Sequence, residues 1–267
     1  REGGGFIGGG AVRLSPADDI VIRVERALDL DREGQLVASV LSKKIAAGSS
    51  HVVLDLPVGP TAKIRTAETA RSLTQDLIDV AQAFGLKALA VITDGSQPVG
   101  RGIGPALEAR DVLSVLQNES AAPTDLRQRS LTLAGALLEL GGVATPGNGE
   151  AMAVATLNSG RAWAKFQRIC EAQGGMRRPP RSSHQHPVIA DRAGRVGGVD
   201  NRRVARVAKL AGAPDAKAAG IEVHVRLNDM IEPGQPLYTI HAEAPGELAY
   251  ALDYAAANPS IYQVIEP

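Results

Sequence analysis

The chain has 267 residues, a length that suits one large domain or one large domain followed by a small one. Its 29 basic and 29 acidic residues balance, so the charge does not favour nucleic acid or a charged membrane surface as a partner. The single cysteine, Cys170, excludes an intrachain disulfide, and no apolar run reaches the roughly 20 residues of a membrane span; we therefore expect a cytoplasmic protein.

Helical and strand-like segments alternate from residue 33 onward. The pattern predicts two helices and two buried strands, in the chain order 33–47 (helix), 51–59 (strand), 66–85 (helix) and 86–94 (strand). Thr66 is expected to cap the second helix, and Gly48 and Gly85 to end the two helices. A strand, a helix and a strand in this order predict a parallel βαβ unit. The expected fold class is α/β, with a mixed or parallel sheet and flanking helices.

The glycine-rich loop 94–104 leads into a helix that is expected to begin at Pro105, a favoured first-turn residue. Further helices are expected at 125–140, 149–173 and 201–212. The Pro, Arg, Ser and His content of 174–187 is typical of a linker, and the alternating pattern of 220–242 predicts strands and hairpins. We expect a central α/β domain at 1–180, a linker at 181–186 and a small α+β, barrel-sandwich-like domain at 187–267.

Two adjacent lysines, Lys43 and Lys44, interrupt the first apolar helix. Neighbouring helical residues point about 100° apart, so at least one of them faces something other than bulk water. Lys44 points into the apolar arc, where it could snorkel or pair with a buried carboxylate. Ser39 and Lys43 are four residues apart and share the polar edge of that arc.

Five motifs occur in order at workable spacings: "RLSPADD" (13–19), "ASVLSKKIAAG" (38–48), "VVLDLPVG" (52–59), "ITDGSQPVGRGIGPALEARDVL" (92–113) and "GIEVHVRLNDMIEPGQPLYTIHA" (220–242). Together they resemble the thymidine phosphorylase and AMP phosphorylase family, the pyrimidine-nucleoside phosphorylases. The motif sequences are closer to those of the AMP phosphorylase-like branch, which includes bacterial "putative thymidine phosphorylases". The resemblance covers nearly the whole chain.

The resemblance implies a pentosyltransferase of nucleotide salvage, which cleaves an N-glycosidic bond with inorganic phosphate and releases a free base and a (deoxy)ribose 1-phosphate. Phosphate is then a co-substrate, and no cofactor is expected. By the family motif, Ser39 and Lys43 hold the base and Lys44 is a packed, ion-paired support. A base-binding arginine maps to Arg23, with Arg26 as the alternative.

In the AMP-cleaving branch an aspartate is the proposed proton donor to the leaving base, and the motif match places this role on Asp94. The alternative is that Asp94 only caps its glycine loop through an Asx turn. Resemblance to the same branch implies that the glycine cluster that includes Gly10 contacts the nucleotide. The alternative is that this cluster is a flexible terminal tail.

The family's phosphate-binding K-H-S-x-G-G-x-G-D-K segment and its N-terminal helical domain have no counterpart in the sequence. We therefore expect the C-terminal part of a larger phosphorylase, a homodimer when full length, that is inactive on its own. The substrate could be thymidine, another nucleoside or AMP, and a non-catalytic nucleobase-binding role is the rival from another class.

Two further classes are weighed against this interpretation. A biotinyl or lipoyl carrier would need an exposed lysine on the attachment turn near the C-terminus, and no such turn is present. A metal site at His184 and His186 lacks a third ligand at a usual spacing. Cys170 has no histidine nearby in the sequence and is expected to be a packing residue.

Overall fold

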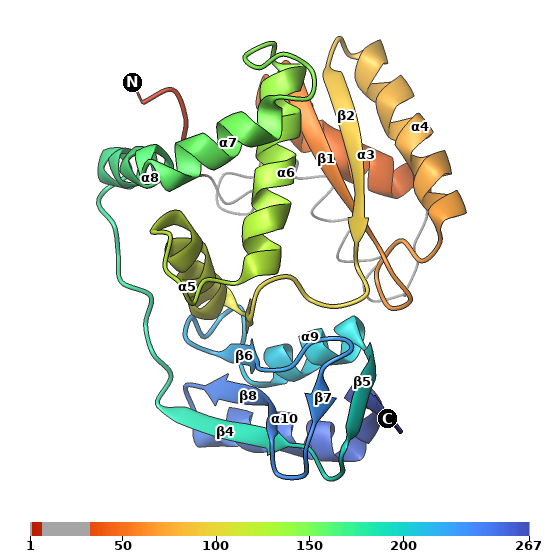
Figure 1. The fold of residues 1–267 in the computed structure, drawn as a ribbon, viewed down its shortest axis with the longest axis vertical. Coiled ribbons are helices and arrows are strands. Elements are labelled where there is room, and N and C mark those ends of the chain that lie inside the picture. The colour runs from red at the N-terminus through yellow and green to blue at the C-terminus, as the bar shows by residue number, and fades with distance from the viewer. Residues whose placement is uncertain (1, 7–32, 267) are drawn as a thin grey trace. The chain divides into compact units, whose positions relative to one another are not determined.

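The computed structural model of the protein describes residues 2–6 and 33–266 (Figure 1). The predictions made for Arg23, Arg26 and Gly10 lie outside these residues. The chain divides into two compact units. The first consists of described residues within 1–56, 66–93 and 131–176, and the second of described residues within 57–65, 94–130 and 177–267.

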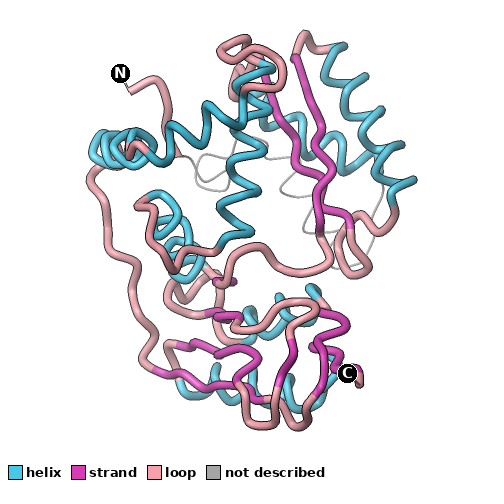
Figure 2. The backbone as a smooth tube through the Cα atoms, in the orientation of Figure 1, coloured by secondary structure: helices cyan, strands magenta, loops and turns pink. Residues whose placement is uncertain are grey.

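The central elements are mostly helical, and Figure 2 separates the helices from the two magenta strands of this region. In chain order they are α3 (Glu33–Ala46), β1 (His51–Val58), α4 (Ala67–Ala83), β2 (Lys87–Asp94), α6 (Thr124–Leu140), α7 (Gly149–Asn158) and α8 (Arg161–Ala172). The segment expected to be helical at 149–173 is thus two helices. They are separated at Gly160, whose φ of 75° is left-handed and interrupts the helical path.

β1 and β2 form a two-stranded sheet. The N–H of Lys87 donates to the carbonyl of Ser50 at 3.0 Å, and the N–H of Gly95 donates to the carbonyl of Val58 at 2.8 Å. Both bonds join residues with the same offset along the chain, as in parallel strands. The two strands with α4 between them are therefore the predicted parallel βαβ unit.

α4 is bounded as the sequence predicts. The Thr66 hydroxyl accepts a hydrogen bond from the N–H of Thr69 at 3.1 Å, which satisfies one of the free donors of the first turn. Gly85, just beyond the helix, has a φ of 72° that an L side chain rarely adopts. The helix buries a stripe of one face, made of Ala70, Leu73, Leu77 and Ala81, and packs against α3.

The second unit contains two antiparallel sheets. The first has the order β3-β6-β8-β4, with β3 (Gly102–Ile103), β6 (Gly220–Val223), β8 (Pro236–Ala242) and β4 (His184–Ile189). The second has the order β7-β5-β9, with β7 (Met230–Ile231), β5 (Gly194–Val199) and β9 (Tyr262–Ile265). Its helices are α5 (Pro105–Leu116), α9 (Asn201–Leu210), α10 (Pro245–Ala257) and the short 3-10 turn Pro259–Ile261.

α9 and α10 pack against β6 and β8 and close one continuous apolar core. Its most deeply buried members are aliphatic: Val196, Val204, Val207, Ile221, Ile231 and Ile240. The mixed α/β fold class, with parallel and antiparallel pairing and a small α+β region at the C-terminal end, is confirmed. No helix in the described part of the chain is long and apolar enough to cross a membrane.

Ile240 provides a test of this core, because its side chain is fully buried on β8. We expect Ile240→Ala to lower the free energy of unfolding by about 2–5 kcal/mol, through lost burial and a residual cavity. Ile189→Ala is the matched control on neighbouring β4, because Ile189 is 55% exposed, and it should cost less than about 1 kcal/mol. Urea unfolding measures both; equal losses would contradict the assigned core.

Candidate functional site

α3 carries the predicted base-binding pair. Ser39 and Lys43 are separated by one helical turn and are half-buried, whereas Val37 and Leu41 on the same helix are buried. Lys44 is also half-buried, so exposure alone does not separate the roles expected of the two lysines. The adjacent Ser42 hydroxyl is buried and has no hydrogen-bond partner among the described residues. One turn of α3 therefore presents hydroxyl and ammonium groups close to its apolar stripe.

Asp94 is the last residue of β2, and its side chain is exposed. Its Oδ1 accepts a hydrogen bond from the N–H of Ser96 at 2.9 Å, which is the Asx turn considered from the sequence. The Arg129 guanidinium of α6 donates to the Asp94 backbone carbonyl. In this arrangement the Asp94 carboxylate caps the glycine loop through Oδ1.

The loops that follow β1 and β2 touch through two buried glycines, Gly59 and Gly95. A Cβ added to Gly59 would lie 2.4 Å from the carbonyl carbon and oxygen of Gly95. A Cβ added to Gly95 would lie 2.9 Å from the carbonyl carbon of Pro57. Only glycine fits at either position without moving backbone, so the contact fixes where Asp94 leaves the sheet.

The first residue of α9 binds both loops. The Asn201 side-chain Nδ2 donates to the Gly95 carbonyl at 2.8 Å, and the Asn201 backbone N–H donates to the Thr61 hydroxyl at 3.1 Å. The Thr61 hydroxyl donates in turn to the Val199 carbonyl at 3.3 Å. Because Nδ2 is committed to a carbonyl, the orientation of the Asn201 amide is set, and its Oδ1 is buried with no hydrogen-bond partner within residues 2–6 and 33–266.

A cavity of about 280 Å³ lies beside this junction, entirely within the second unit. Its polar lining comes from the loop after β2, from α6 and from α9, and consists of Asp94, Gln97, Arg129 and Asn201. Its apolar lining includes Pro57, Val99 and Val204. A carboxylate, a guanidinium and two amides on an otherwise apolar wall can orient a small polar heterocycle.

Ser39 and Lys43 belong to the first unit and Asp94 to the second. The cavity brings Asp94 together with Arg129 and Asn201, two residues that the sequence analysis did not single out. "VDNRR" (199–203) predicts only a helix start, and the Asp200 carboxylate does cap α9 by accepting from Arg202 and Arg203 N–H groups. No feature of the sequence around Asn201 indicates that its side chain forms a hydrogen bond with Gly95, 106 residues away.

The other candidate residues of the sequence analysis have ordinary surroundings. His184 and His186 lie on β4, within the segment expected to be a linker; His184 is half-buried and His186 is exposed. Cys170 is half-buried on α8. Among the residues that the structure describes, no group of three or more His, Cys, Asp or Glu side chains is arranged to hold a metal ion.

Comparison with known proteins shows which family the chain resembles. Residues 195–261, which run from within β5 to the end of the 3-10 turn, match the family model described as the pyrimidine nucleoside phosphorylase C-terminal domain. The resemblance drawn from the five motifs is therefore confirmed. Residues 195–261 are thus similar to the C-terminal domain of the pyrimidine nucleoside phosphorylases.

Particular relatives match over the rest of the chain as well. A protein of Chelativorans sp. (strain BNC1) named "Putative thymidine phosphorylase" is 63% identical over 263 residues, which cover 98% of this chain and 52% of the relative. A protein of the same name from Polaromonas sp. (strain JS666) is 63% identical over 266 residues, which cover 100% of this chain and 52% of the relative. The chain thus spans about half the length of the curated relatives that it matches.

The glycine contact gives a direct test of the loop junction. We expect Gly59→Ala to lower the free energy of unfolding by about 1–3 kcal/mol, because the new methyl group must push the Gly95 backbone away. Gly246→Ala on α10 is the matched control: an added Cβ there meets nothing within 4 Å, and alanine favours a helix. Thermal unfolding compares the two; a Gly59→Ala protein as stable as Gly246→Ala would show that the loops do not touch.

Proposed function

We propose that this chain recognises the base of a pyrimidine nucleoside, with thymidine as the first candidate, during its phosphorolysis to free base and (deoxy)ribose 1-phosphate. The observation that carries the proposal is the pairing of Ser39 and Lys43 on one face of α3, half-buried, within the "SVLSKK" motif. The names of the relatives support thymidine as the substrate.

The chemistry requires the sugar to pass through an oxocarbenium-like state while the base departs with its bonding electron pair. The departing thymine anion carries its charge largely on the ring carbonyl oxygens. A fixed ammonium from Lys43 and a hydroxyl from Ser39 can donate hydrogen bonds to these oxygens and stabilise the charge as it develops. Their i, i+4 spacing lets both groups reach one edge of a flat ring.

Asp94 is proposed as the proton donor. Inorganic phosphate attacks C1′, the glycosidic bond breaks, and the Asp94 carboxyl transfers its proton to the base nitrogen. A carboxyl group that donates near neutral pH must hold its proton there, which burial favours. Asp94 is exposed without a ligand, so this role requires the bound substrate to shield the carboxyl from water.

The two neighbouring lysines allow a matched test of base recognition. We expect Lys43→Met to weaken thymine binding by roughly 10- to 100-fold, the value of a hydrogen bond from a charged donor. Lys44→Met removes the same charge one residue away and should change thymine affinity by less than about threefold if only the Lys43 ammonium meets the base. Isothermal titration calorimetry of the two variants and the original chain measures the difference.

Adenine is the comparison ligand in the same titrations. Thymine binding that exceeds adenine binding and depends on Lys43 supports pyrimidine-nucleoside phosphorolysis. Absence of thymine binding to the unaltered chain, or an equal loss in both lysine variants, would overturn the proposed role of α3.

A further inference from the structure

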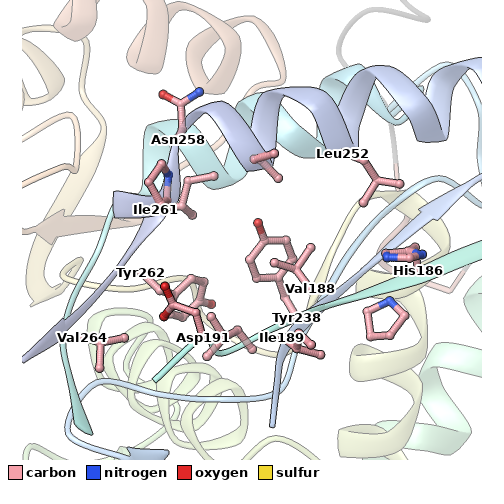
Figure 3. Close-up of a pocket in the computed structure, with 15 residues that line it drawn as sticks. His186, Val188, Ile189, Asp191, Tyr238, Leu252, Asn258, Ile261, Tyr262 and Val264 are labelled. Carbon is pink, nitrogen blue, oxygen red and sulfur yellow. The ribbon is translucent and has the colours of Figure 1, made fainter. Parts of the chain in front are cut away.

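A second cavity, of about 340 Å³, lies in the C-terminal antiparallel region (Figure 3). Its walls come from β4, β8, α10 and β9, and it shares no lining residue with the cavity at Asp94. Most of the lining is aliphatic, with Val188, Leu237, Leu252, Ile261 and Val264. The volume lies within the range of small-molecule pockets in proteins.

Two buried tyrosines line this cavity. Tyr238 of β8 is 3% exposed and Tyr262 of β9 is 4% exposed, and their rings stack with centroids 5.6 Å apart. The Tyr262 hydroxyl is buried and has no hydrogen-bond partner in the described part of the chain. Figure 3 shows the Tyr238 hydroxyl pointing from its strand into the open space beneath α10.

Burial raises the pKa of both tyrosine hydroxyl groups. It raises the pKa of Tyr238 to about 12, with no other cause acting on that group, and it also raises the pKa of Tyr262. Both side chains are therefore neutral phenols that can donate as well as accept a hydrogen bond. Of the two hydroxyls, that of Tyr238 faces the cavity, so a ligand there can form a hydrogen bond with it.

The rim limits the charge of the ligand. Asp191 is exposed at the mouth beside Tyr262, and Asn258 and His186 are the other polar side chains that line the cavity. Among the residues that the structure describes, no lysine or arginine side chain lines the cavity. The Arg192 guanidinium donates to the carbonyl of the lining residue Val264 at 2.8 Å, so the charge near Asp191 is balanced. The aliphatic walls disfavour a charged ligand and favour an uncharged, flat molecule.

We propose that this cavity is a separate ligand site for a small neutral aromatic molecule with one hydroxyl group, which inserts beneath α10 and forms a hydrogen bond with Tyr238. The ring packs against the aliphatic walls, and the hydroxyl reaches the buried end of the cavity. This site lies outside the phosphorolysis chemistry proposed for Ser39, Lys43 and Asp94.

The probe is p-cresol, with toluene as the same ring without the hydroxyl. Calorimetric titration of the chain should give at least fivefold tighter binding of p-cresol than of toluene. Tyr238→Phe should weaken p-cresol binding by about fivefold, the value of one neutral hydrogen bond, and leave toluene affinity within twofold. Tyr250→Phe is the matched control, because Tyr250 is 68% exposed on α10 and does not line the cavity.

A second variant keeps the test decisive if the core tolerates Tyr238→Phe poorly. Ala256 lines the cavity from the exposed end of α10, and Ala256→Trp should block p-cresol and toluene alike, with binding reduced at least tenfold. Failure of p-cresol to bind, or binding that neither Tyr238→Phe nor Ala256→Trp changes, would overturn the proposal.

Discussion

The arrangement of the second unit depends on the close approach of two glycines. Gly59 and Gly95 follow parallel strands, and their backbones lie too close for a side chain on either residue. Loops at the carboxyl ends of parallel strands are where open α/β sheets bind ligands. The glycine contact therefore determines the position of Asp94 and of the cavity beside it, and the Asn201 amide holds the Gly95 carbonyl in that position.

The hydrogen bond from Asn201 to Gly95 connects the loop that follows Asp94 to the C-terminal region. α9 has its first turn capped by Asp200, and the side chain of its first residue, Asn201, donates to a carbonyl of the loop after β2. The helix is in turn packed in the apolar core with β6, β8 and α10. The match to the C-terminal domain model, residues 195–261, therefore includes Asn201, which bonds to the Asp94 loop. Stability of the small domain and geometry of the loop are therefore linked physically.

The sequence predicted the elements that local chemistry specifies. Thr66 caps α4, Pro105 begins α5, and Gly85 ends a helical path, because each of these residues acts within one turn of its own position. The break at Gly160 was not predicted, since a single glycine inside an apolar helical pattern is also tolerated. The Asx turn at Asp94 was foreseen as an alternative to catalysis and is present, and a residue can serve both roles. The roles of Arg129 and Asn201 could not be predicted, because their partners lie far away in the sequence.

Recognition of a flat base by a hydroxyl and an ammonium one helical turn apart is the central claim. Its most direct test is a two-dimensional amide NMR titration of the ¹⁵N-labelled chain with thymine. The account predicts that the amide signals of α3 around Ser39 and Lys43 shift in a saturable manner with increasing thymine. Saturable shifts confined to other elements, with the α3 signals unmoved, would contradict it.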